Sequence, residues 1–202
     1  MIRVKEYYPC VQGEGTLSGT PMWLLRLAGC DVGCPWCDTK ESWPLGAQEH
    51  DPLSLAAYFR QDKPNIRWVM VTGGEPLLQN LDALCDTLHE AGLLTALETS
   101  GTAPMSGTWD HTTVSPKLGM PGKKQLLSSV VNAADEIKMP VATHTDIEVL
   151  LRDVLPMLDF AEPTISLQPI SLNPKATHVC YQACLDLGWN LSLQQHKFIG
   201  AK

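Results

Sequence analysis

The sequence has no stretch of roughly 18 consecutive apolar residues, the length that a membrane-spanning helix needs. Its beginning, residues 1–6, lacks the apolar core of a signal peptide. Basic residues are few: 15 Lys and Arg stand against 22 Asp and Glu, which gives a net charge of −7, and no basic block is present. We therefore expect a cytoplasmic protein whose main partner is neither a membrane nor a nucleic acid.

Internal repeats, low-complexity segments and flexible linkers are also missing, so residues 1–202 are expected to form one domain. Apolar residues make up 44% of the chain, which is enough for a single core. The seven cysteines are an odd number for a framework of disulfide bonds. Without a secretion signal, they fit metal or cluster ligation in a reducing compartment better.

Three of the cysteines, Cys30, Cys34 and Cys37, form a C-x3-C-x2-C loop directly after an apolar segment. Thiolates hold iron–sulfur clusters, and a four-iron cluster with three protein ligands keeps one iron open to a ligand that is not protein. A zinc site is the alternative. Zinc usually takes four Cys or His ligands in two separated pairs, however, and the sequence has no second C-x2-C pair.

Apolar segments that end in polar or glycine-rich residues alternate with segments of helical periodicity, which is typical of an α/β fold with parallel strands. We expect strands at 22–27, 67–72, 93–98, 112–116, 134–139 and 164–167, a last strand at 190–195, and helices at 51–61, 81–91, 145–158 and 173–188. The third and fourth strands are joined only by a short, helix-poor connection. The fold is therefore expected to be a partial, open (β/α) barrel of about six parallel strands, with the active site at their carboxyl ends.

Three features near the expected strands point to ligands. Gly73-Gly74-Glu75-Pro76 follows one strand, and glycines there leave backbone amides and carbonyls open to a bound molecule. Arg26 lies inside the strand that leads to the cysteine loop, and a buried charge needs either an anionic ligand or a structural ion pair. The glycines around Glu14 could present its carboxylate to a ligand or simply form a turn.

The cysteine triad and Gly73-Gly74-Glu75-Pro76 together resemble the radical S-adenosylmethionine (SAM) superfamily. Segments along nearly the whole chain are further similar to one family within it, the 7-carboxy-7-deazaguanine synthases. These segments are residues 12–15, 26–30, 34–39, 72–76, 98–101, 115–117 and 168–169. The family-level signals among them are Gln-Gly-Glu-Gly, Cys-Asp-Thr and Ser-Pro-Lys.

This resemblance implies a lyase of the radical SAM type that acts in queuosine biosynthesis. Its substrate would be the small-molecule pterin 6-carboxy-5,6,7,8-tetrahydropterin, and its cofactors would be a [4Fe–4S] cluster, SAM and Mg2+. One electron would cleave SAM to a 5′-deoxyadenosyl radical, which would take the C6 hydrogen of the pterin. Ring contraction with loss of ammonia would then give 7-carboxy-7-deazaguanine and regenerate SAM. The implied partners are a reducing electron donor, such as a flavodoxin or ferredoxin, and a second copy of the chain in a homodimer.

The resemblance also assigns binding residues, although it names no catalytic side chain. For the substrate it implies Val11, Gln12, Gly13, Glu14, Arg26, Thr72 and His196. For SAM it implies Trp36, Cys37, Asp38, Gly74, Ser115, Pro116, Lys117, Gln168, Pro169, Ile170 and Ser171. For the metals it implies Cys30, Cys34 and Cys37 at the cluster and Thr39 at Mg2+.

The residue types suit these roles. Arg26 offers a fork for a pterin carboxylate, and Glu14 can accept hydrogen bonds from an aminopyrimidinone edge. The Thr39 hydroxyl with substrate oxygens would give Mg2+ the hard ligands that it prefers. Two simpler explanations stay open: His196 could be a structural histidine, and Thr39 could only cap a turn.

Two other functions also stay open. A glycyl-radical activase shares the cysteine triad and the Gly-Gly-Glu-Pro motif, but it would act on a protein partner and need no pterin. A non-enzymatic iron–sulfur electron carrier would use four cysteines and has no need of that motif. Arg26 and the Cys-Asp-Thr segment favour the pterin enzyme over the activase, and cleavage of SAM would separate both enzymes from the carrier.

Overall fold

The computed structural model describes residues 1–201, whose strands form one nine-stranded sheet with the order β3-β1-β2-β4-β5-β6-β7-β8-β9. The strands are β1 (Ile2–Val11), β2 (Pro21–Leu27), β3 (Gln48–His50), β4 (Trp68–Gly73), β5 (Leu94–Thr99), β6 (His111–Val114), β7 (Glu136–Val141), β8 (Thr164–Pro169) and β9 (Asn190–Leu191). β2 and β4 to β9 are parallel, whereas β1 is antiparallel to both β2 and β3. The sheet ends at β3 and β9 without closing, so the expected partial, open barrel is confirmed.

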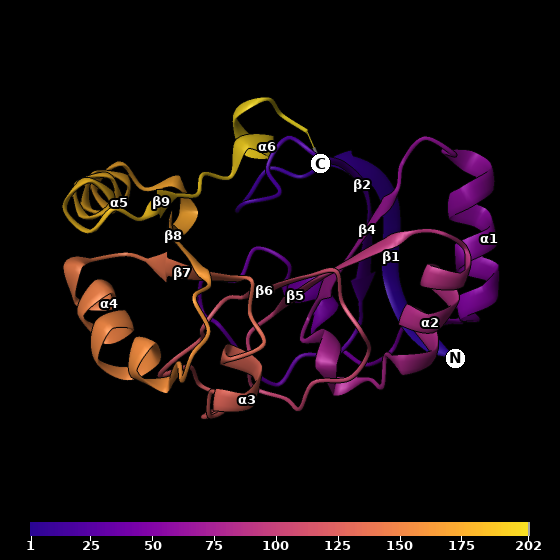
Figure 1. The fold of residues 1–202 in the computed structure, drawn as a ribbon, viewed down its shortest axis with the longest axis horizontal. Coiled ribbons are helices and arrows are strands. Elements are labelled where there is room, and N and C mark those ends of the chain that lie inside the picture. The colour runs from indigo at the N-terminus through magenta and orange to yellow at the C-terminus, as the bar shows by residue number, and fades with distance from the viewer. Residues whose placement is uncertain (202) are drawn as a thin grey trace.

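Helices lie at both ends of this sheet (Figure 1). They are α1 (Pro52–Asp62), α2 (Asp82–Glu90), α3 (Ser128–Val131), α4 (His144–Val149), α5 (Pro174–Leu187) and α6 (Gln195–Phe198). α1 and α2 lie together beyond β4, α4 and α5 lie beyond β7, and α6 lies close to the loop that follows β1 (Figure 1). No helix within residues 1–201 is long and apolar enough to cross a membrane.

Local sequence signals set the helix ends. The Asp51 carboxylate accepts a hydrogen bond from the Ser54 amide at 3.1 Å, so it caps α1 ahead of a proline in the first turn. Asn173 caps α5 in the same way, and Gly188 ends that helix in the left-handed conformation with φ of +70°. The helix expected at 145–158 is interrupted: α4 gives way to a π turn at 150–154 and a 3-10 turn at 155–157. Pro156 lacks the amide that a continuous α-helix needs.

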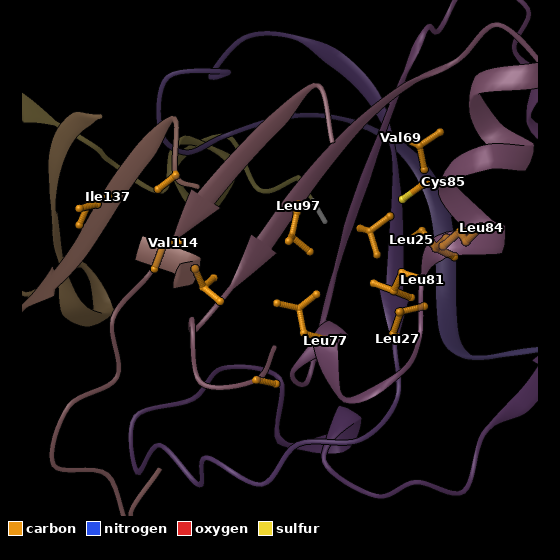
Figure 2. Packing of buried hydrophobic residues seen from close by; sticks show 14 of the residues in the cluster. Leu25, Leu27, Val69, Leu77, Leu81, Leu84, Cys85, Leu97, Val114 and Ile137 are labelled. Carbon is orange, nitrogen blue, oxygen red and sulfur yellow. The ribbon is translucent and has the colours of Figure 1, made fainter. Parts of the chain in front are cut away.

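The apolar core lies between the sheet and its helices. Figure 2 shows strand residues such as Leu25 and Leu97 on the same side as Leu84 of α2. Because side chains alternate along a strand, the neighbours of the core residues face the other side of the sheet. On β2, Leu25 is fully buried in this core, whereas Leu24 and Arg26 line the cavity described below.

The strands differ from the sequence-based expectation at both ends of the chain. The long β1 was not expected; it contains charged residues and a register shift between Val4 and Glu6, so it lacks a clean alternating pattern. The last strand, expected at 190–195, is only the two residues of β9, and residues 195–198 form α6 instead.

Candidate active site

A cavity of about 490 Å3 opens at the carboxyl ends of the parallel strands and along the inner side of the sheet. Its wall includes a row across three neighbouring strands, because Arg26 of β2 is paired in register with Glu6 of β1 and with Thr72 of β4. The rest of the wall comes from other strand residues, from the loops that follow β1, β2, β4, β5, β6 and β8, and from the C-terminal segment that contains α6. This is the location at which parallel α/β sheets bind ligands.

The cysteine loop lies at one side of the cavity, and Cys30, Cys34 and Cys37 all line it. The Cys37 amide donates to the Cys34 carbonyl at 3.1 Å, which closes a tight turn inside the triad. Within residues 1–201, no three His, Cys, Asp or Glu side chains converge on a point that could hold a single metal ion. A cluster does not require such convergence, because its thiolates bind different iron atoms. The donor set therefore fits an iron–sulfur cluster.

The Gly-Gly-Glu-Pro segment packs directly against the cysteine loop. The Glu75 amide donates to the Gly29 carbonyl at 2.8 Å, and a Cβ on Gly74 would overlap that carbonyl and approach Cys30. Only glycine therefore fits at position 74. The Glu75 side chain is 1% exposed and accepts hydrogen bonds from Thr99 at 2.7 Å and from the Ser100 amide at 2.8 Å. The buried carboxylate fixes this segment to the end of β5.

Glu14 lies at the centre of a polar network in the same cavity. Its Oε2 accepts hydrogen bonds from Lys138 Nζ at 2.9 Å and Gln168 Nε2 at 3.0 Å, and its Oε1 accepts one from Gln194 Nε2 at 2.9 Å. Burial alone would raise the pKa of Glu14, but the Lys138 ammonium and these hydrogen bonds lower it to about 2. Lys138 also contacts both Glu98 oxygens, at 2.7 and 2.8 Å. Its attraction to the two carboxylates outweighs its burial and raises its pKa, so it is an ammonium at neutral pH.

Arg26 has a partner within the protein. Its Nε donates to Glu6 Oε1 at 2.9 Å, and the Arg26 side chain is 13% exposed against 28% for Glu6. The structural ion pair that the sequence left open is therefore present. The pair lines the cavity, so an anionic ligand that approaches Arg26 would meet a guanidinium that Glu6 already orients.

The side chains near the cysteine loop combine cations with an aromatic ring. Lys117 Nζ lies 5.4 Å from the centre of the Trp36 ring and 3.0 Å from the Ser115 carbonyl. Burial lowers the pKa of Lys117 to about 8. Lys197 Nζ of α6 contacts Asp38 Oδ2 at 2.8 Å, which links the C-terminal helix to the cysteine loop.

α6 also packs against the loop that carries Glu14. The Gln195 amide donates to the Gly13 carbonyl at 2.9 Å. A Cβ on Gly13 would come within 2.6 Å of the His196 ring, so this glycine allows the histidine to approach the loop. The position of His196 at the cavity is compatible with a ligand contact.

The structure brings the expected site residues together. Pro116 does not line the cavity among the described residues; the other residues assigned from the resemblance do, including Val11, Thr39, Gly74, Pro169, Ile170 and Ser171. The sequence-based assignment missed Glu6, Lys138 and Gln194, which also line it. Lys138 carried a usable signal, because it is a charge inside an expected strand, as Arg26 is. Gln194 carried none, since its partner Glu14 lies 180 positions away.

Comparisons with known proteins agree with this geometry. A family described as "4Fe-4S single cluster domain" matches residues 11–104. The matched segment contains both the cysteine loop and the Gly-Gly-Glu-Pro motif.

Two curated relatives align over almost their whole length. The 7-carboxy-7-deazaguanine synthase of Escherichia coli (strain K12) is 36% identical over 220 residues, with 97% of each protein covered. The 7-carboxy-7-deazaguanine synthase of Synechocystis sp. is 34% identical over 205 residues, with 98% of this chain and 93% of the relative covered. A solved structure described as "Crystal structure of QueE from Escherichia coli" has a TM-score of 0.89 and 36% sequence identity, and the match covers 96% of this chain and 94% of that chain.

Proposed function

The chain belongs to the 7-carboxy-7-deazaguanine synthase family, and on that premise we propose that it makes 7-carboxy-7-deazaguanine from 6-carboxy-5,6,7,8-tetrahydropterin with loss of ammonia. It is a radical SAM lyase of queuosine biosynthesis, and its cofactors are a [4Fe–4S] cluster and SAM. When bound, the cluster and SAM supply the radical chemistry. One observation carries the proposal: the cysteine triad and the Gly-Gly-Glu-Pro segment share one cavity wall, and Glu14 and Arg26 line the same cavity.

The polar residues opposite the cysteine loop would bind the pterin. Arg26 would take the pterin carboxylate with the guanidinium that Glu6 orients through its Nε. Glu14 Oε1 accepts one hydrogen bond, from Gln194, and a carboxylate oxygen can accept two. The second acceptor site can receive an N–H of the aminopyrimidinone edge. Thr72, beside Arg26, and Gln12 complete this part of the wall.

The residues around the cysteine loop would bind SAM. Lys117 supplies a half-buried cation near Trp36, and Ser115 holds its ammonium group. Gly74 exposes its backbone beside Cys30, which suits the close approach of a small zwitterion. The segment from Gln168 to Ser171 would close the opposite side.

Thr39 would bind Mg2+ together with oxygens of the substrate. Its hydroxyl lines the cavity, 3.7 Å from Cys37 Sγ. Thr39 also precedes the short 3-10 turn at 40–42, yet no amide of that turn, among those the structure describes, donates to its hydroxyl. The turn-capping role left open by the sequence therefore has no hydrogen bond to support it. One hydroxyl from the protein suffices, because Mg2+ usually takes most of its ligands from water and substrate oxygens and does not need several carboxylates.

We further propose that residues 1–202 form one catalytic domain, which the single shared sheet supports. The proposed homodimer and the flavodoxin or ferredoxin donor are supported by the family resemblance alone. Cytoplasmic location is supported by the cysteine content, since three free thiols at a cluster site require a reducing compartment.

Anaerobic turnover tests the function. The reconstituted protein is incubated with SAM, dithionite and 6-carboxytetrahydropterin, and the products are identified by mass spectrometry. We expect 7-carboxy-7-deazaguanine with no net consumption of SAM. Cleavage of SAM without conversion of the pterin would favour the activase, and absence of any SAM cleavage would favour the electron carrier.

A further inference from the structure

A second buried carboxylate, Glu136, lies behind the Glu14 loop and outside the cavity wall. It is 1% exposed. Its Oε2 accepts two hydrogen bonds from Thr16, one from the amide and one from the hydroxyl, both at 3.1 Å. Its Oε1 accepts a hydrogen bond from the Ser166 hydroxyl at 2.5 Å. One carboxylate thus joins the loop that follows β1 to strands β7 and β8.

The loop is built to allow this contact. Gly15 has φ of +64°, a conformation that favours glycine, and a Cβ at this position would lie 2.5 Å from Glu136 Oε2. The Gly15 amide donates to the Ser192 hydroxyl at 2.8 Å, and that hydroxyl donates to Gln168 Oε1 at 2.8 Å. Gln168 in turn donates to Glu14, so the backbone after Glu14 and its side chain are held by one connected network.

β7 holds this loop in two places. Glu136 and Lys138 are two residues apart on the strand, so they face the same side of the sheet. Lys138 binds the Glu14 carboxylate, while Glu136 binds the backbone two residues further along the loop. The His111 ring, 3.9 Å from Glu136 Oε2, together with Ser166 and Thr16 lowers the pKa of Glu136 to about 2 against the effect of burial, so its carboxylate is ionised at neutral pH and remains a strong acceptor.

We propose that Glu136 is a positioning residue: it fixes the Gly15–Thr16 peptide and so holds Glu14 where it can bind the aminopyrimidinone edge of the pterin. This inference rests on the proposed function, and it concerns a residue that does not touch the ligand. Loss of the Glu136 charge weakens pterin binding only through Glu14. The cysteine triad and Lys117, which would hold the cluster and SAM, make no hydrogen bond or ion pair with Glu136 among residues 1–201.

The test is a double-mutant cycle on the reconstituted enzyme with Glu136→Gln, Glu14→Gln and the double variant. We expect KM for 6-carboxytetrahydropterin to rise about tenfold in Glu136→Gln, the scale of one weakened charge-assisted hydrogen bond. In the Glu14→Gln background, Glu136→Gln should add no further loss. In the single variant Glu136→Gln, iron content and SAM cleavage without pterin should equal those of the wild type. Ser166→Ala is the matched control, because it removes a contact to the other oxygen of Glu136 and leaves Thr16 in place.

Equal losses from Glu136→Gln in both backgrounds would overturn the proposal, as would an unchanged KM or a parallel loss of SAM cleavage. If Glu136→Gln does not fold, Thr16→Val removes one of the same hydrogen bonds. It should raise KM about threefold, and only when Glu14 is present; an unchanged KM, or an equal rise without Glu14, would overturn the proposal. Failure of the wild type to convert the pterin would instead refute the proposed function.

Discussion

Replacing Lys138 with methionine should destabilise the protein by about 3–5 kcal/mol at neutral pH, the cost of removing one partner from a buried ion pair. The Lys138 side chain is 2% exposed, and it contacts Glu98 and Glu14 at 2.7 and 2.9 Å. Methionine fills a similar volume, so little of the loss comes from a cavity. The cost comes from two carboxylates that stay in the interior without a cation.

The pH dependence identifies this mechanism. In the wild type the pKa of Glu14 is about 2 in the folded state, below its ordinary value of 4.5. Glu14 therefore contributes stability above pH 4.5, and that stability is lost as the pH falls towards 2. In Lys138→Met the ammonium is lost, and we expect burial to outweigh the remaining hydrogen bonds from Gln194 and Gln168 and to raise the pKa of Glu14 above its ordinary value. The folded variant then takes up a proton more readily than the unfolded chain, so its deficit should shrink between pH 8 and pH 5.

Chemical denaturation under anaerobic conditions measures both effects, with the free energy of unfolding of each protein compared at pH 8, 7, 6 and 5. We expect the deficit of Lys138→Met to fall by about 1 kcal/mol over this range. Lys124→Met is the control: Lys124 pairs with Asp31, but both side chains are more than a third exposed, so its loss should stay below about 1 kcal/mol. A pH-independent deficit, or one no larger than that of the control, would refute the reasoning.

Three further predictions concern the ligands. Cys34→Ala should abolish cluster binding and SAM cleavage. Cys180 is buried on the core face of α5, so Cys180→Ala should leave iron content unchanged. The reverse result in an iron assay would contradict the cluster assignment. Arg26→Ala should weaken pterin binding by about 1.5–3 kcal/mol at normal cluster content, as titration of the reconstituted protein would show, and an unchanged affinity would exclude the role. Added Mg2+ should stimulate turnover in the wild type and in Thr39→Ser but not in Thr39→Ala; equal stimulation in all three would make Thr39 a turn residue.

The sequence predicts the parts of the fold that local signals determine. The capping residue Asn173 and the left-handed Gly188 bound α5 as expected. Most parallel strands are short apolar segments, and Figure 2 shows their buried side chains, such as Val69 and Leu97, in one core with side chains of α2. These features depend on residues that are close in the sequence, so they can be predicted from the sequence pattern alone.

The strand predictions fail at segments that line the cavity, because polar side chains there are buried against partners far away in the sequence. Glu6 and Tyr8 of β1 face the site, so the strand lacks the alternation that a half-buried strand would show. After β9, Ser192 and Gln194 are buried because they bind the Glu14 loop. Their burial at every second position resembles the pattern of a strand, although this segment is not a strand. Polar side chains with distant partners produce both errors.

The charged side chains in and around the cavity fall into two groups that differ in solvent exposure and in the role for which they are suited. Glu75, Glu136 and Lys138 are 2% exposed or less, and each is held by several hydrogen bonds from different strands or loops. Such groups cannot exchange partners with an entering ligand without leaving a buried charge uncompensated, so they are suited to fixing loops.

Arg26 with Glu6, and Asp38 with Lys197, are instead single ion pairs in which at least one member is more than a quarter exposed. Because water already reaches them, a ligand carboxylate or amine can join these pairs at little cost in desolvation. Both pairs lie at the cavity wall, one between β1 and β2 and one beside the cysteine loop. The fully buried charged side chains therefore fix the loops that form the cavity. The partly exposed charged side chains are available to bind the polar groups of a ligand.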